Sequence, residues 1–223
     1  RSPKRSPPSR SGQRSCALAR KFLISMPFPQ SPAPLAQALS SRGYDKPTSV
    51  QEAVLQDEAR GRDLVVSAQT GSGKTVAFGL AFADQVLGED GDLLSRGAPS
   101  ALVIAPTREL ALQVSKELGW LYESTGARIA SCVGGMNPQA ERRALKAGAT
   151  IVVGTPGRLR DHIERGALDL SALAVIVLDE ADEMLDMGFR EELEYILDAT
   201  PQGRRVLMFS ATMPRPIEAM ARR

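Results

Sequence analysis

Short apolar runs alternate with amphipathic segments along the chain from residue 34 onward. The runs are rich in β-branched and aliphatic residues, which is typical of buried strands, and the intervals have helical spacing. The predicted strands are Leu64–Ser67, Ala101–Ala105, Arg128–Cys132, Thr150–Val153, Ala174–Leu178 and Arg205–Ser210. The predicted helices include Arg108–Tyr122, Gly188–Ala199 and two segments before residue 60. This alternation favours an α/β fold with a mostly parallel sheet covered by helices on both faces.

The composition divides the chain into three parts. Residues 1–25 are rich in Arg, Ser and Pro and lack hydrophobic periodicity, so they are predicted to be a disordered basic tail. Three interpretations of this tail stay open: sequence added upstream of the native start, a solvated native tail, or a basic arm that contacts nucleic acid. Residues 26–62 are predicted to form a helical region, and residues 63–223 a single α/β domain without internal repeats.

The charge and the scarce residues exclude several classes of protein. The net charge is +2, yet residues 1–25 hold seven basic residues and no acid, so the remaining chain is acidic with a net charge of −5. One histidine, His162, excludes a multi-histidine metal site, and Cys16 and Cys132 do not form a disulfide framework. The longest run without polar side chains, Val76–Ala83, is too short to span a membrane. A cytoplasmic protein without a membrane segment is therefore predicted.

A glycine-rich segment follows the first predicted strand and opens a helix. It comprises Ala68, Gln69, Thr70, Gly71, Ser72, Gly73, Lys74 and Thr75. Its two glycines can adopt positive φ, so that successive backbone N–H groups surround phosphate oxygens. In such a loop Lys74 reaches the β- and γ-phosphates and the Thr75 hydroxyl binds Mg²⁺. The alternative is a chance glycine turn.

Acidic residues follow the predicted strand that ends at Leu178. Asp179 and Glu180 come first, and Asp182 lies two residues further on. In a phosphate-loop NTPase, Asp179 would hold Mg²⁺ through its water shell, and Glu180 would orient and deprotonate the attacking water. The alternative is a surface acidic cluster that caps the following helix.

Seven motifs in order resemble the DEAD-box family of ATP-dependent RNA helicases, specifically the first of its two RecA-like domains. The motifs are Gly43–Gln51 (the Q motif), Ala68–Thr75 (motif I), Pro106–Ala111 (Ia), Gly134-Gly135 (GG), Thr155–Arg158 (Ib), Asp179–Asp182 (II) and Ser210–Thr212 (III). The resemblance covers residues 34 to 223. It implies a RecA-like P-loop NTPase fold that binds ATP or ADP with Mg²⁺, with Glu180, Asp179 and Lys74 as the catalytic residues.

The resemblance assigns adenine recognition to the Q motif, through Tyr44, Lys46, Thr48 and Gln51. The Gln51 amide offers a donor and an acceptor that match adenine N7 and its exocyclic amine, whereas guanine presents the wrong groups. The alternative for Gln51 is an exposed helix glutamine. The aromatic residue that the family stacks on adenine falls at Met26 in this register, and Phe28 lies two residues out of step.

The resemblance also implies contacts to an RNA backbone that read no base sequence. The residues are Pro106, Thr107, Arg108, Gly134, Gly135, Thr155, Pro156, Gly157 and Arg158. Helix capping is a second role open to Thr107 and Thr155. Asp182, Ser210 and Thr212 would couple the state of the nucleotide to strand separation.

These implications predict a parent protein that couples ATP hydrolysis to RNA binding and local duplex unwinding. The chain contains no second RecA-like domain, so by itself it is expected to be a monomer that binds adenine nucleotide but is nearly inactive. The parent's C-terminal RecA-like domain is the expected partner. Two other functions stay open, namely a nucleotide-gated RNA clamp and a DNA-directed helicase or other phosphate-loop ATPase.

Overall fold

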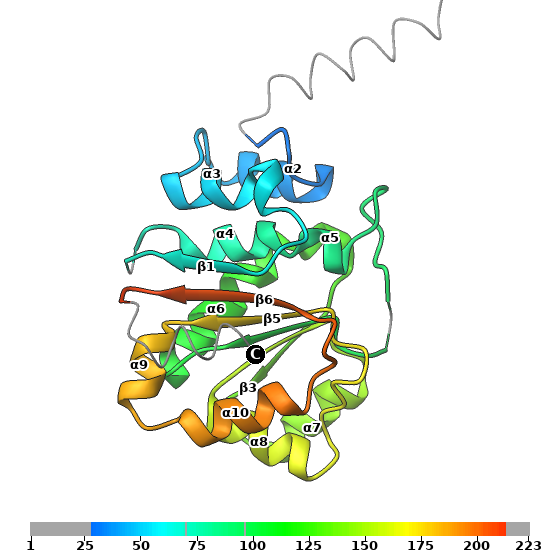
Figure 1. The fold of residues 1–223 in the computed structure, drawn as a ribbon. Helices are drawn as coiled ribbons and strands as arrows, with labels where there is room; N and C mark the ends of the chain where they lie inside the picture. The colour runs from blue at the N-terminus through cyan, green and yellow to red at the C-terminus, as the bar shows by residue number, and fades with distance from the viewer. Residues whose placement is uncertain (1–27, 70, 96, 213–223) are drawn as a thin grey trace, which may run out of the picture.

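A computed structural model of the chain describes residues 28–69, 71–95 and 97–212, and its centre is a six-stranded parallel sheet in the order β1-β6-β5-β2-β4-β3 (Figure 1). The predicted disordered tail and Met26 lie outside the described residues. The strands are β1 (Leu64–Ser67), β2 (Ala101–Ile104), β3 (Ile129–Cys132), β4 (Ile151–Gly154), β5 (Val175–Asp179) and β6 (Arg205–Ser210). The predicted fold class and all six predicted strands are confirmed, with ends that differ by at most one residue.

Alternation along the strands creates two apolar cores, one on each face of the sheet. Val103, Val153 and Val177 point to one face, and their neighbours Leu102 and Ile176 point to the other. The first core packs against α2 (Ala33–Ser41), α3 (Ser49–Leu55), α4 (Lys74–Ala81), α5 (Ala83–Val86) and α6 (Arg108–Leu121). The second packs against α7 (Pro138–Lys146), α8 (Pro156–Glu164), α9 (Ala181–Asp186) and α10 (Arg190–Asp198). Two short 3₁₀ helices, η1 (Asp57–Ala59) and η2 (Glu123–Thr125), complete the described elements.

One buried arginine joins the helical region before β1 to the sheet. The Arg205 guanidinium at the start of β6 donates hydrogen bonds to the carbonyl oxygens of Arg62, Ala81 and Ala59. Burial lowers the pKa of Arg205, although Asp84 and Asp63 oppose this. The first helices therefore belong to the same packed body as the sheet.

All six strands run in parallel, so their carboxyl ends meet at one edge of the sheet. Every predicted motif from the glycine-rich loop onward follows a strand at this edge, which lies toward the left of Figure 1. Ligands of open α/β sheets bind at such an edge. Among the described residues, no helix combines the length and the hydropathy that a membrane crossing requires.

Candidate nucleotide site and nucleic-acid surface

The glycine-rich loop runs from β1 into α4 with two left-handed glycines. Gly71 and Gly73 both have φ of 83°, as the sequence predicted for a loop whose N–H groups turn inward. Ala68 is buried and donates its N–H to the Ser210 carbonyl of β6, whereas Gln69 is exposed. Thr70 lies outside the described residues. The loop is thus anchored at its start and leads directly into a helix N-terminus, the setting in which anions bind.

Lys74 brings the loop and the acidic strand end together. Its Nζ lies 3.1 Å from Glu180 Oε1 and 3.5 Å from Asp179 Oδ1. Both Lys74 and Asp179 are nearly inaccessible, with 7% and 1% of the side chain exposed. Three charged groups from two distant parts of the sequence therefore share one poorly solvated position at the strand ends.

The two acidic residues of this group are unusual in different ways, Asp179 in its pKa and Glu180 in its backbone conformation. Burial raises the pKa of Asp179 to about 6, although Lys74 opposes the shift. Glu180 adopts φ 54° and ψ 54°, so it is the one residue other than glycine with positive φ among those that the structure describes. Such a conformation costs about 1–2 kcal/mol, and strain of this kind is typical of residues held for a function.

The residues at this edge fit a phosphate and a divalent cation. Asp179 Oδ1 and Ser72 Oγ are buried and meet no hydrogen-bond partner within the described part of the chain, although Asp179 Oδ1 is ion-paired with Lys74 Nζ at 3.5 Å. Thr75, at the second position of α4 and three residues after Ser72, is also buried. The oxygens of a carboxylate and of two hydroxyls are hard ligands of the kind that Mg²⁺ and its bound phosphates require.

Replacing Asp179 with Asn is expected to stabilise the chain without nucleotide at neutral pH. The folded-state pKa of about 6 lies above the ordinary value of 3.8, so the buried carboxylate costs about 3 kcal/mol above pH 6. The folded chain takes up this proton as the pH falls below 6, which removes the cost. Urea unfolding should show a higher midpoint for Asp179→Asn at pH 7.5 and no difference at pH 4. A lower midpoint at pH 7.5 would contradict this assignment.

The Q-motif residues contact the glycine-rich loop directly. Thr48 Oγ1 donates to the Ser72 carbonyl at 2.9 Å, and Gln51 Nε2 donates to the Gly73 carbonyl at 3.3 Å. Gln51 Oε1 accepts the Thr48 N–H, and Thr48 Oγ1 in turn accepts the N–H of Gln51, which forms a capping box for α3. Gln51 is fully buried, so the alternative of an exposed helix glutamine is wrong.

The aromatic residues near the Q motif pack against other parts of the protein. Phe28 has 1% of its surface exposed and packs in the first core, so its ring is not presented to an open surface. The Tyr44 ring lies 5.7 Å from that of Trp120 on α6, and Arg42 stacks on the same Trp120. Lys46 is exposed.

The predicted RNA-contact residues follow β2, β3 and β4 in neighbouring loops. Gly135 has φ of 78°, and a Cβ at this position would lie only 2.6 Å from Arg108 Nη1. A side chain at position 135 would therefore displace Arg108. Gly134 and Gly157 are exposed, whereas Pro106 and Pro156 are buried.

The capping alternative holds for only one of the two threonines. Thr107 accepts the Leu110 N–H and caps α6, while Thr155 precedes α8 without a side-chain cap.

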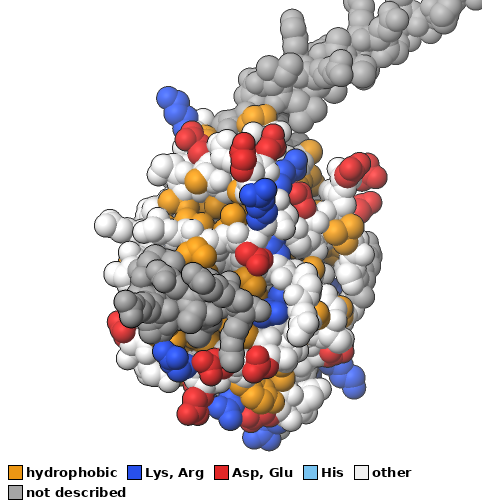
Figure 2. Space-filling model, in the orientation of Figure 1, with side chains coloured by type: hydrophobic (Ala, Val, Ile, Leu, Met, Phe, Trp, Pro, Cys, Tyr) orange, Lys and Arg blue, Asp and Glu red, His pale blue; other side chains and the backbone are white. Residues whose placement is uncertain are grey.

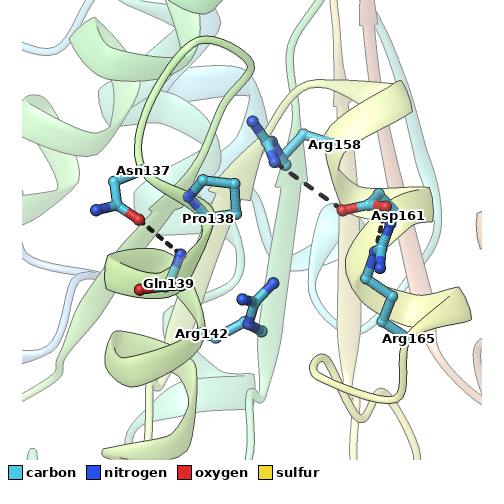
Figure 3. A pocket seen from close by; sticks show the side chains of 7 residues that line it. All are labelled: Asn137, Pro138, Gln139, Arg142, Arg158, Asp161 and Arg165. Atoms are coloured by element: carbon cyan, nitrogen blue, oxygen red, sulfur yellow. Dashed lines mark hydrogen bonds and ion pairs between the residues drawn. The ribbon is translucent and has the colours of Figure 1, made fainter.

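Arg158 on α8 borders a pocket of about 600 Å³, and Arg142 of α7 forms its opposite wall (Figure 3). On the face that Figure 2 displays, acidic and basic side chains are interspersed, so no single-sign patch dominates that face.

The last motif contacts the acidic strand end. The N–H and Oγ1 of Thr212 both donate to Asp182 Oδ2 at 2.8 Å, and Ser210 Oγ accepts the Asp182 N–H at 3.3 Å. Although burial alone would raise it, these hydrogen bonds lower the pKa of Asp182. The contact between these motifs that the resemblance implied is present.

Two residues at this edge were not predicted as site residues. A hydrogen bond with Glu180 raises the pKa of Glu183, and burial and the charge of Glu180 act in the same direction. Glu141 on α7 accepts the Val133 N–H directly before the GG loop and is ion-paired with Arg158 of α8. Neither residue belongs to a motif, and the one sequence signal for Glu183 is the acidic run at positions 179–183. His162 and Met184 are buried and Met187 is exposed.

Comparisons with known proteins agree on one family. The model of the DEAD/DEAH box helicase family matches residues 48–220. The chain is 46% identical over 192 residues to the ATP-dependent RNA helicase DeaD of Escherichia coli K12, covering 86% of this chain and 30% of DeaD. It is 43% identical over 187 residues to the DEAD-box ATP-dependent RNA helicase CshA of Geobacillus kaustophilus, covering 84% of this chain and 39% of CshA.

A solved structure supports the same family. A DEAD box protein from the hyperthermophile Methanococcus jannaschii superposes with a TM-score of 0.77 at 40% identity, covering 86% of this chain and 51% of that one. The chain therefore spans about a third of the curated relatives that it matches and about half of this structure.

Proposed function

Because this chain belongs to the DEAD/DEAH box helicase family, we propose that it is the ATP-binding N-terminal domain of an RNA helicase that couples ATP hydrolysis to RNA binding and local duplex unwinding. The observation that carries the proposal is the group formed by Lys74, Asp179 and Glu180 at the strand ends. The predicted RNA-contact loops follow β2, β3 and β4 at the same edge. A C-terminal RecA-like domain in the parent protein would complete the enzyme.

The glycine-rich loop would bind the phosphates of ATP. The N–H groups around Gly71 and Gly73 supply donors, and Lys74 supplies a positive charge to the β- and γ-phosphates. Thr75 and Asp179 would hold Mg²⁺, Asp179 through a water molecule. When bound, the ion neutralises charge that develops on the transferring phosphoryl oxygens.

Glu180 would act as the general base. Its carboxylate lies 3.1 Å from Lys74 Nζ in the chain without nucleotide. A phosphate that binds Lys74 competes for this ammonium group, which weakens the ion pair and lets Glu180 accept a proton from the attacking water. The left-handed backbone at Glu180 fixes the direction from which the carboxylate approaches. ATP binding would thus prepare its own hydrolysis.

Gln51 and Thr48 would connect adenine recognition to the phosphate loop. The contacts to the Ser72 and Gly73 carbonyls mean that any movement of Gln51 toward a base also acts on the loop. Gln51 retains one amide hydrogen and one lone pair beyond its present partners, which is what adenine N7 and its amine require.

Replacing Gln51 with Ala is expected to weaken ADP binding to the chain about tenfold. One to two hydrogen bonds to the base and the support of Gly73 are lost, which corresponds to about 1–2 kcal/mol. Because these contacts distinguish adenine from guanine, the preference for ADP over GDP should fall as well. Calorimetric titration of both nucleotides measures this. Equal ADP affinity of Gln51→Ala and wild type would argue against the adenine role.

The RNA surface would rely on local contacts. With a net charge of −5 outside residues 1–25, the body of the chain does not attract a polyanion in general. Arg108 beside Gly135 and the exposed Gly157 in the first turn of α8 would provide donors for phosphate oxygens. Asp182 with Ser210 and Thr212 would transmit the nucleotide state to this surface.

The proposal is tested with the full-length protein. It should hydrolyse ATP faster when RNA is added than when DNA of the same length is added, and it should separate a short RNA duplex. The 223-residue chain, which spans about a third of the curated relatives that it matches, should bind ADP but turn over ATP about 10³–10⁵-fold more slowly, since arginines supplied from another domain contribute a factor of this size to phosphoryl transfer. RNA-stimulated hydrolysis without unwinding would instead support a clamp, and equal stimulation by DNA would support another phosphate-loop ATPase.

A further inference from the structure

Glu141 of α7 lies at the centre of a buried polar cluster behind the predicted RNA surface. Its Oε1 accepts the Val133 N–H at 3.0 Å, directly before the GG loop. Its Oε2 lies 2.6 Å from His162 Nε2 and 3.6 Å from Arg158 Nε, both on α8. One carboxylate thus joins the loop that follows β3 to the helix that follows β4.

His162 is committed to this cluster. It is fully buried, and its Nδ1 has no hydrogen-bond partner among the described residues, so Nε2 makes its single polar contact. A carboxylate can only accept, so Nε2 carries the hydrogen and donates it to Glu141. This donor occupies one lone pair of Oε2 and fixes the carboxylate in a plane that also faces Arg158.

Arg158 is the residue on which the cluster acts. Only 16% of its side chain is exposed, and Asp161 lies 3.9 Å away on the same helix. Asp161 is in turn shared with Arg165 (Figure 3). Two carboxylates therefore hold the Arg158 guanidinium in one orientation at the rim of the pocket between α7 and α8.

The same cluster could be taken for a metal site, since ligand atoms of Cys132, Glu141 and His162 lie within 4.8 Å of one another. Three observations oppose this. Burial, with a contribution from Glu141, raises the pKa of the Cys132 thiol to about 12, although Arg158 lowers it, so the thiol stays protonated. Both Glu141 oxygens are already engaged. The Arg158 cation lies 3.6 Å from the carboxylate and would repel a metal ion.

We infer that Glu141 and His162 form a positioning pair that holds Arg158 and the GG loop in the arrangement that binds an RNA backbone. The inference rests on the proposed function, because it assumes that Arg158 and the loop contact RNA. A guanidinium and a loop that are ordered before binding lose less conformational entropy when a phosphate arrives, so the pair raises RNA affinity without touching RNA.

The test measures binding of a fluorescent single-stranded decauridylate to the full-length protein in the presence of a non-hydrolysable ATP analogue. Glu141→Gln keeps an acceptor for Val133 and removes the charge that faces Arg158, so affinity should fall three- to tenfold. Glu141→Ala also releases the GG loop and should cost more. Glu164→Gln removes an exposed carboxylate from the same α8 and should change affinity less than twofold.

Two comparisons separate positioning from loss of fold. His162→Gln retains a donor for Glu141 and should retain most of the affinity, whereas His162→Leu should lose it. In an Arg158→Ala background, Glu141→Gln should have no further effect, because it acts through Arg158. Affinities for ADP should be unchanged in all of these variants.

The outcomes are distinct. Wild-type protein that does not bind the RNA overturns the proposed function, and the inference falls with it. Wild-type binding combined with unchanged or higher affinity of Glu141→Gln overturns the inference alone, as does an additive loss in the Arg158→Ala background. One equivalent of zinc in the purified protein that His162→Leu removes would also overturn it, since the cluster would then be a metal site.

Discussion

Replacing Glu180 with Gln is expected to lower RNA-stimulated ATP turnover of the full-length protein by about 10²–10⁴-fold, the contribution of a positioned general base. Gln has nearly the same shape as Glu but cannot accept the proton of the attacking water. Its side-chain oxygen can still accept a hydrogen bond from Lys74 Nζ, which now lies 3.1 Å from Glu180 Oε1. The change should therefore affect kcat far more than the affinity for ATP.

Steady-state hydrolysis at saturating RNA measures this effect. Glu191→Gln is the matched control, because it makes the same chemical change at an exposed position on α10, outside the motifs. It should lower turnover less than tenfold. Turnover of Glu180→Gln within threefold of wild type would remove Glu180 from the role of base.

Replacing Lys74 with Met is expected to weaken ADP binding to the chain about 10- to 150-fold. The loss corresponds to one charge-assisted hydrogen bond to phosphate of about 1.5–3 kcal/mol. The variant also leaves two carboxylates, those of Asp179 and Glu180, without their cation. Removing one partner of a buried ion pair is destabilising, so the urea midpoint is measured beside the affinity.

Titration of the chain with a fluorescent ADP analogue provides the affinity. Lys116→Met, on the exposed side of α6, removes the same charge at a distance from the motifs and serves as the control. It should bind as wild type does. A folded Lys74→Met chain with wild-type affinity would contradict the assignment of the phosphate loop.

The sequence predicted the elements of this site better than their contacts. Strand periodicity and two glycines sufficed for β1, for the loop after it and for the positive φ of Gly71 and Gly73. The order of the strands in the sheet could not be predicted in this way, because periodicity does not encode which strands are neighbours. The meeting of Lys74 with Asp179 was therefore expected from the chemistry of a phosphate loop and an acidic strand end and from the resemblance, whereas its distances came only from the structure.

Residues outside the motifs escaped prediction for a physical reason. Glu141 looks like an ordinary helix residue, and it becomes buried because α7 and α8 pack into the same core on one face of the sheet. The local sequence does not indicate that the Glu180 backbone is left-handed, since this conformation is imposed by β5 and α9, which Glu180 joins. Gln51 was expected to face a base, and its contact with Gly73 depends on how α3 packs on α4.

The central claim is that the carboxyl edge of the sheet is a site for adenine nucleotide and Mg²⁺. Calorimetric titration of the 223-residue chain with ADP and with GDP, each in the presence of Mg²⁺, tests it most directly. We expect one site per chain, with ADP bound at least about tenfold more tightly than GDP. Absence of saturable ADP binding, or equal affinity for the two nucleotides, would contradict it.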